Sequence, residues 1–188
     1  MKTSNDALDL RIRRTYKFLW NALLSLMKER DFESITVTDI CERAMVHRTT
    51  FYKHYEDKYG LLFHGMQDEL SALFTAVDRR VEQDNKADNQ TRHIAVLEFV
   101  QQHEDFYRLM LVGDGFGKFS TLFRNAIAER LERHRRHNGQ PTSIPMALHT
   151  QIAAAAIVRM ISWWLENDCA YAPAEMVQYV SDHLDLIK

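Results

Sequence analysis

The stretch from Thr36 to Lys58 constrains the fold of this chain more than any other part of the sequence. Thr36 is followed three residues later by Asp39, which predicts a capping box with Asp in place of the usual Glu or Gln. The helix that this box opens is expected to end near Ala44, after about two turns. The stretch therefore begins with a short helix whose start is well defined.

A second short helix is expected after a turn at Met45 and Val46. Phe51 and Tyr55 lie four residues apart, so both can face inward from the same side of this helix. The outward-facing residues are then Thr49, Tyr52 and Lys53. A short helix, a turn of about three residues and a second helix rich in hydroxyls, aromatics and cations are typical of a helix-turn-helix DNA reader.

The end of this stretch reads Thr50-Phe51-Tyr52-Lys53-His54-Tyr55, then Asp57-Lys58 and Leu61-Leu62. It resembles the N-terminal domain of the TetR (tetracycline-repressor-type) transcriptional regulators, which usually ends on a pattern like T-F-Y-x-H-F, a capped Lys and a leucine pair. Spacing and residue types both match, and the match extends back through the first helix. It covers roughly the first third of the chain by motif, and the rest only by length and helical pattern.

Two residues depart from the family pattern. Met45 stands in the turn where a Gly is common, and His47 caps the second short helix in place of the stronger caps Ser or Asp. These departures concern the pitch of the reading helix and leave the expected fold unchanged. The resemblance implies an N-terminal three-helix DNA-binding domain over residues 1–57 and a helical ligand-binding and dimerisation domain over residues 58–188.

Apolar residues recur at steps of three and four along the chain, which predicts helices, and no segment alternates like a strand. The polar segment 83–90, the glycines at 113–115, the segment 138–141 and Pro173 predict breaks between helices. The expected fold class is therefore all-α, with about nine helices. Outside the helix-turn-helix stretch, the expected helices span residues 5–30, 57–84, 91–103, 106–111, 118–137, 145–167 and 173–186.

The net charge of −2 gives little support to nucleic-acid binding. Residues 1–60 hold 11 Lys and Arg against 9 Asp and Glu, whereas residues 61–188 hold 13 against 17. The difference has the right sign and is small. Binding to DNA must therefore depend on where individual cations are placed.

Composition favours a cytoplasmic protein. The two cysteines, Cys41 and Cys169, are too few for a disulfide framework, which indicates a reducing compartment. The apolar pattern from Leu8 to Leu26 is interrupted by cations and is not that of a signal peptide. The most apolar segment, 152–165, is shorter than the ~20 residues that span a bilayer.

Arg48 is the best candidate for a base contact, because its planar fork suits O6 and N7 of guanine. The residues expected to contact DNA are Thr38, Arg48, Thr49, Thr50, Tyr52, Lys53, His54 and Lys58. Of these, Thr38, Tyr52, His54 and Lys58 match positions where the family holds backbone phosphates. The alternatives to DNA contact are purely structural. Tyr52 and His54 could pack between helices, and Lys58 could be a solvated surface residue. The basic start of the first helix, Arg11 to Lys17, either faces phosphates or is simply solvated.

The last two helices are expected to form the dimer interface, as they do in the family. Residues 152–165 are apolar on more than one face, which indicates burial on two sides. The proposed interface residues are Ile152, Ala156, Trp164, Met176, Val180 and Leu184. The alternative is the ordinary core of a monomer. A symmetric operator needs two readers, which favours the dimer.

Many members of the family hold a small effector in the second domain. Candidate lining residues are Met66, Phe74, Phe106, Met110, Phe123, Met160 and Trp163. Methionines and aromatics at helical spacing also form plain cores, so this alternative stays open. The sequence does not identify an effector.

Enzymatic chemistry and a metal site are not expected. No glycine-rich phosphate loop, nucleophile elbow or metal-spaced Cys and His cluster is present. His134 and His137 lie three residues apart, but four arginines around them would repel a bound cation. We therefore expect no cofactor and no metal.

The sequence predicts a homodimeric DNA-binding transcriptional regulator, a repressor in preference to an activator, that binds a pseudo-palindromic operator and responds to a small effector. The alternative on the same scaffold is a protein-binding adapter or a partner-dependent activator. The operator, the target genes and the sign of regulation are not encoded in these patterns.

Overall fold

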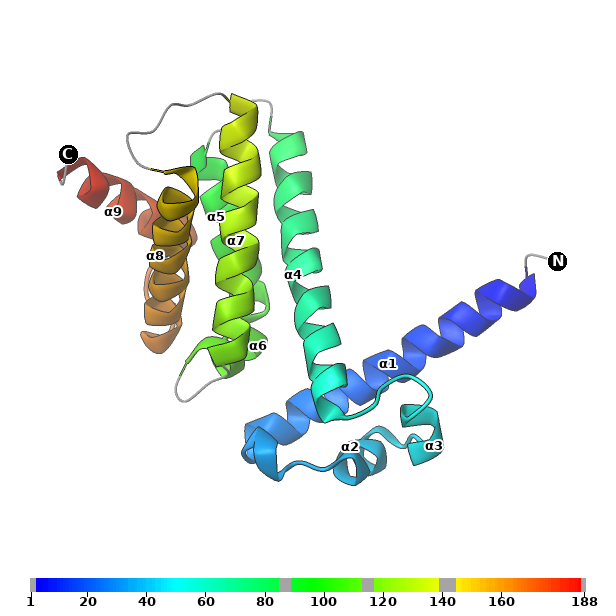
Figure 1. Cartoon of the computed structure of the whole chain (residues 1–188). Coiled ribbons are helices and arrows are strands. Elements are labelled where there is room, and N and C mark those ends of the chain that lie inside the picture. Colours follow the sequence, from blue (N-terminus) through cyan, green and yellow to red (C-terminus); the bar gives the residue numbers. More distant parts are fainter. Residues whose placement is uncertain (1–2, 85–88, 113–116, 139–144, 187–188) are drawn as a thin grey trace. The chain divides into compact units, whose positions relative to one another are not determined.

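The computed structural model describes residues 3–84, 89–112, 117–138 and 145–186 (Figure 1). The described part of the chain holds nine α-helices and one 3-10 turn, and no strand, which confirms the all-α prediction. The elements are α1 (Thr3–Glu29), η1 (Phe32–Ser34), α2 (Val37–Ala44), α3 (Arg48–Phe51), α4 (Lys58–Gln83), α5 (Asn89–Gln102), α6 (Glu104–Leu111), α7 (Gly117–Asn138), α8 (Met146–Glu166) and α9 (Pro173–Leu186).

The helix ends agree with the expected ones to within a few residues. The α4 helix ends at Gln83 and α5 begins at Asn89, on either side of the middle of the polar segment. The glycines at 113–115 and the segment 139–141 lie outside the described residues. Within the described residues, no helix is long and apolar enough to cross a bilayer.

The chain divides into two compact units, the first ending at Glu69 and the second beginning at Leu70. The border between the two units lies inside α4, so this helix contributes residues to each unit. The domain border expected from the sequence, between residues 57 and 58, is the point at which α4 begins.

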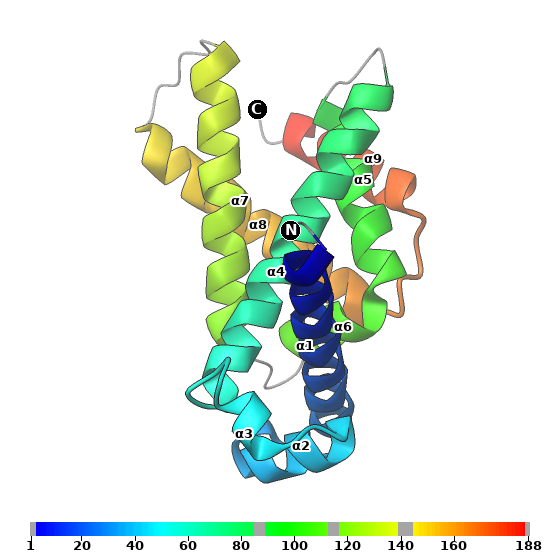
Figure 2. The same ribbon diagram turned by 90° about the vertical axis from the view of Figure 1, so that its right-hand side faces the viewer.

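In the first unit, α1 lies against α2 and the start of α4 (Figures 1 and 2). One apolar stripe of α1 is buried in this packing. Leu19 and Leu23 of α1, Ile40 of α2 and Phe51 of α3 are fully buried. Ile12, which continues the stripe in the sequence, is 41% exposed. The expected stripe therefore extends further along α1 than the packed core does.

Gly65 of α4 lies directly against Trp20 of α1. A Cβ atom at Gly65 would overlap ring atoms Cε3, Cζ3 and Cη2 of the indole. Glycine in a helix interior lowers stability by roughly 1 kcal/mol relative to alanine, so its presence here reflects packing. The missing side chain lets the indole lie on the α4 backbone.

The second unit is built around aromatic side chains of α6 and α7. The ring centroids of Phe106 and Phe119 are 5.2 Å apart, and those of Tyr107 and Phe123 are 5.8 Å apart. All four side chains are buried. The α7 helix also packs along α8, and α5 packs on α9.

We expect Gly65→Ala to lower the free energy of unfolding by about 1–3 kcal/mol, although alanine is the better helix former. The added Cβ must displace Trp20. Urea unfolding measures the change.

Gly60→Ala is the matched control, since a Cβ at Gly60 would meet its nearest atoms, in Asp57 and Tyr55, at 3.8 Å, which is an ordinary contact. Equal stability of the two variants would show that Trp20 does not depend on the glycine.

Candidate nucleic-acid interface

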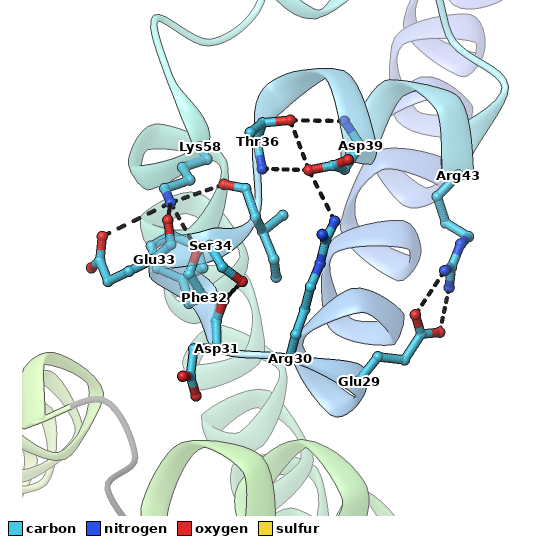
Figure 3. Close-up of polar contacts among 11 residues, drawn as sticks. Glu29, Arg30, Asp31, Phe32, Glu33, Ser34, Thr36, Asp39, Arg43 and Lys58 are labelled. Carbon is cyan, nitrogen blue, oxygen red and sulfur yellow. Dashed lines mark hydrogen bonds and ion pairs between the residues drawn. The ribbon is translucent and has the colours of Figure 1, made fainter.

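The start of α2 is fixed by the capping box that the sequence predicts (Figure 3). The Asp39 backbone N–H donates to Thr36 Oγ1 at 3.2 Å, and the Thr36 backbone N–H donates to Asp39 Oδ2 at 2.8 Å. Arg30 adds an ion pair to the same carboxylate at 2.9 Å. The hydrogen bonds from Thr36, followed by Arg30, hold the pKa of Asp39 below its usual value. The carboxylate that orients α2 therefore stays charged at neutral pH.

A second arginine ties α2 to α1 (Figure 3). The Arg43 guanidinium donates to both carboxylate oxygens of Glu29, at 2.8 and 2.9 Å, and to Ser25 Oγ at 2.7 Å. The hydrogen bond from Arg43 lowers the pKa of Glu29. Arg30 and Arg43 thus serve the framework of the first unit.

The turn between α2 and α3 is closed by backbone hydrogen bonds. Met45 adopts the left-handed conformation, with φ 53° and ψ 41°, and Val46 N–H donates to the Cys41 carbonyl at 2.9 Å. His47 occupies the N-cap position of α3, and its side chain makes no capping hydrogen bond. The short α3 must therefore be held by its packing.

Phe51 supplies that packing. Its side chain is fully buried, and its ring lies 5.5 Å from the ring of Tyr52 and 5.7 Å from that of Tyr55. The Tyr55 hydroxyl is 2.7 Å from His64 Nδ1 on α4, and burial raises the pKa of Tyr55 to about 12. Tyr55 is therefore a neutral phenol, and its contact with His64 ties the segment after α3 to α4.

Most of the expected DNA-contacting residues are on the surface of the first unit. Arg48 and Thr49 are exposed in the first turn of α3, whereas Thr38 and Thr50 are half-buried. The exposed residues that follow are Tyr52, Lys53 and His54. Across the described ranges, no side chain forms a hydrogen bond or an ion pair with the charged groups of Arg48 and Lys53.

Lys58 differs from the expectation. Its ammonium donates to the carbonyls of Phe32, Glu33 and Ile35 at 2.8, 2.9 and 2.9 Å, and lies 4.5 Å from the ring centroid of Phe32 (Figure 3). Only 12% of the side chain is exposed. All three donors of the ammonium are used, so Lys58 holds no phosphate in this arrangement. This corrects the expected role of Lys58 from a DNA contact to a clamp within the first unit.

Glu33 and His64 also take part in this framework, although no sequence motif identifies them. Tyr59 Oη donates to Glu33 Oε2 at 2.6 Å, beside the Lys58 clamp. The His64 ring lies against the ring of Tyr16 in a tilted arrangement, with 4.7 Å between ring centroids. Burial and the neighbouring Asp68 raise the pKa of Tyr16. Both residues depend on partners that are distant in the sequence, and no local motif identifies them.

The expected dimer residues divide into two groups in the second unit. Ile152, Ala156 and Val180 are exposed, but Trp164 and Met176 are buried. Trp164 Nε1 donates to the Tyr171 carbonyl at 2.9 Å, so this indole is part of the protomer's own core. Trp164 and Met176 therefore do not form an open face, which corrects the expectation. The Leu184 side chain lies outside the described ones.

The exposed face of α8 also includes Leu148 and Trp163, which were not among the expected interface residues. Leu148 and Ile152 lie one turn apart and are 52% and 57% exposed, and Trp163 follows three turns after Ile152. The Trp163 ring stacks on Tyr171, which in turn meets Tyr179 edge-on at 5.7 Å. Leu148 and Ile152 are 4 residues apart, and Ile152 and Trp163 are 11 residues apart, so all three fall on one side of a helix. This spacing could have predicted that they share a face that does not include Trp164.

The candidate effector-lining residues do not share one environment. Phe106, Met110 and Phe123 are buried in the second unit, and Met66 is buried in the first. Phe74 and Met160 are half-buried, and the Arg130 guanidinium lies 4.8 Å from the Phe74 ring centroid. Trp163 is on the surface rather than in the interior.

No three His, Cys, Asp or Glu side chains gather to form a metal site among the described residues. The His137 side chain is not among them.

Comparison with known proteins agrees with this arrangement. Residues 19–64 match the family of bacterial regulatory proteins of the tetR type, and residues 90–185 match the C-terminal region of such transcriptional regulators. A relative from Bacillus subtilis (strain 168), the uncharacterized HTH-type transcriptional regulator YxbF, is 30% identical over 163 residues. That match covers 85% of this chain, which spans 42% of the relative's length.

Solved structures show the same fold. A TetR transcriptional regulator from Streptococcus agalactiae 2603V is 25% identical, with a TM-score of 0.71 over 93% of this chain and 96% of the other. The regulator FadR from Bacillus subtilis, solved in complex with stearoyl-CoA, is 15% identical, with a TM-score of 0.60 over 88% and 95% of the two chains. This chain belongs to the TetR family of DNA-binding transcriptional regulators.

Proposed function

We propose that this regulator binds a pseudo-palindromic operator as a homodimer, acts as a repressor and is released by a small effector. Residues 1–57 would form the DNA-binding domain, and residues 58–188 the effector-binding and dimerisation domain. The observation that carries the proposal is the exposed Arg48 and Thr49 pair at the start of α3, whose side chains form no hydrogen bond or ion pair with the residues that the structure describes.

The use of the other cations supports Arg48 as the base reader. Arg30 and Arg43 are paired with Asp39 and Glu29, and the ammonium of Lys58 is enclosed by carbonyls. Arg48 keeps its whole guanidinium fork available for guanine O6 and N7, a pairing that discriminates by about 1–3 kcal/mol.

Backbone phosphates would be held by the polar residues around Arg48. Lys53 supplies an exposed cation, and Tyr52 and His54 supply exposed hydrogen-bonding groups next to it. Thr38 and Thr50, which are half-buried residues, carry hydroxyl groups that can bind phosphate oxygens. Contacts of this kind fix the register of a reading helix on DNA without selecting a sequence.

The dimer would form through the exposed face of α8 together with α9. This face presents Leu148, Ile152 and Trp163 around the small residues Ala155 and Ala156. Small residues allow a helix of a second protomer to approach closely, and the apolar side chains around them supply buried area. Two readers are needed for two half-sites about 34–36 Å apart or a multiple of that distance.

An effector would act by changing the separation of the two readers. FadR, a structural neighbour, is described in complex with stearoyl-CoA. The apolar interior of the second unit around Phe106 and Met110 is compatible with an apolar effector once space opens there. A ligand releases DNA if it binds better to a conformation in which the two DNA-binding domains are too far apart or too close for the half-sites. A repressor that is released in this way allows transcription.

Selection from random duplex DNA at low salt tests the DNA-binding proposal. An enriched pseudo-palindromic site is the expected outcome. A folded dimer that enriches no sequence would favour the alternative, a protein-binding adapter. Enriched binding that needs a second protein would instead favour a partner-dependent activator.

Arg48→Ala is expected to weaken binding to the selected site by about 5- to 150-fold and to remove the preference at one base pair of each half-site. The loss follows from removing the fork that reads guanine. Binding curves on the selected site and on single-base variants give the measurement. An unchanged base preference would show that Arg48 does not read bases.

Lys58→Met and Lys53→Met form a matched pair of lysine substitutions. Lys58→Met should lower the free energy of unfolding by about 1.5–3 kcal/mol, because it removes three hydrogen bonds from a charged donor. Lys53→Met should leave stability within about 0.5 kcal/mol of the parent and reduce the salt dependence of DNA binding by about one unit of slope. A reduced salt slope for Lys58→Met with unchanged stability would restore Lys58 as a phosphate contact.

Ala156→Glu is expected to convert the dimer to a monomer, since it places a charge in the centre of the proposed interface. Ala72→Glu, an exposed alanine of α4, is the control and should remain dimeric. Sedimentation measures the assembly state, and circular dichroism checks that both variants stay helical. A dimeric Ala156→Glu variant would place the interface elsewhere.

A further inference from the structure

Met45 combines two unusual properties. It is a non-glycine residue in the left-handed conformation, with φ 53° and ψ 41°, a backbone shape that favours glycine. Its side chain is also 93% exposed, the highest value among the exposed large hydrophobic residues described. A long apolar side chain therefore projects into solvent from a strained position.

The backbone of the turn explains the conformation but not the side chain. Met45 N–H donates to the Glu42 carbonyl at 3.2 Å, and Val46 N–H donates to the Cys41 carbonyl at 2.9 Å. These bonds require a left-handed residue at position 45, and a glycine would meet that requirement with less strain. Because Met45 is 93% exposed as a residue, its side chain gains almost nothing from packing against the described residues.

The surroundings of Met45 indicate what the side chain contacts. Met45 lines a depression of about 320 Å³ between α2 and α3, together with Arg48, Glu42 and Thr38. The depression therefore contains the donor guanidinium of Arg48, the acceptor carboxylate of Glu42 and the apolar end of Met45. These are the groups that distinguish base pairs in the major groove, where guanine offers acceptors, cytosine a donor and thymine a methyl group. The Glu42 carboxylate can accept a hydrogen bond from the amino group of cytosine, so the depression suits base edges.

We propose that Met45 is a specificity-determining residue of the DNA-reading surface, whose terminal Sδ–CH3 group packs on the C5-methyl of a thymine next to the base pair read by Arg48. This inference rests on the proposed DNA binding through α3. The occupant of the depression is the major-groove edge of a B-form duplex. The strain at position 45 is then offset only when DNA is bound.

The test compares the parent and Met45→Gly on the selected operator. In a selection from random duplexes, Met45→Gly should lose roughly three- to tenfold of the preference for thymine at one position of each half-site. Replacing that thymine by deoxyuridine removes the methyl group alone. The substitution should weaken binding of the parent and leave binding of Met45→Gly unchanged, while Met45→Leu should keep part of the preference.

Stability separates this role from a structural one. Met45→Gly should unfold at an equal or higher temperature, because glycine relieves the left-handed strain, and yet read DNA less selectively. Met45→Asn, which tolerates this backbone but lacks the apolar tip, should behave like Met45→Gly in the deoxyuridine comparison.

Two results would overturn the inference, and each has a distinct meaning. If the parent selects a site and Met45→Gly selects the same site with the same deoxyuridine penalty, Met45 does not read thymine. A uniform loss of affinity for all sequences would also exclude base reading by Met45. If the parent selects no sequence at all, the proposed DNA binding fails first.

Discussion

The first unit depends on one buried cation. Lys58 begins α4, and its ammonium is surrounded by carbonyls of residues 32–35, which immediately precede α2. Helices as short as α2 and α3 are not stable alone in water, so they need tertiary anchors. The Lys58 clamp fixes the chain before α2 and Phe51 fixes α3, so the surface that α2 and α3 present keeps its shape between these two anchors.

The net charge of −2 makes the placement of individual cations in the first unit important. Some cations near α3 form ion pairs within the first unit, and others are exposed. Arg30 and Arg43 neutralise acids within the first unit, which leaves Arg48 and Lys53 to face solvent. In the proposed complex, affinity for DNA would depend on these few cations and not on an overall positive field.

Local patterns predicted the local structure well. The Thr36 and Asp39 capping box and the burial of Phe51 depend on residues within one or two turns, and both were predicted correctly. The sequence could not reveal that Lys58 points towards carbonyls about 25 residues earlier, because nothing near Lys58 encodes that contact. Trp164 was misassigned for a related reason. In an apolar helix, composition alone does not tell which face packs within the protomer.

The close fit of Trp20 on Gly65 gives the first unit an optical label of its own. The chain has three tryptophans, and the other two, Trp163 and Trp164, lie on α8. An indole lying on a helix backbone changes its emission when that contact opens. With both α8 indoles replaced by phenylalanine, the fluorescence that remains would report the α1–α4 crossing alone, so opening of this contact within the first unit could be followed in real time without an attached dye.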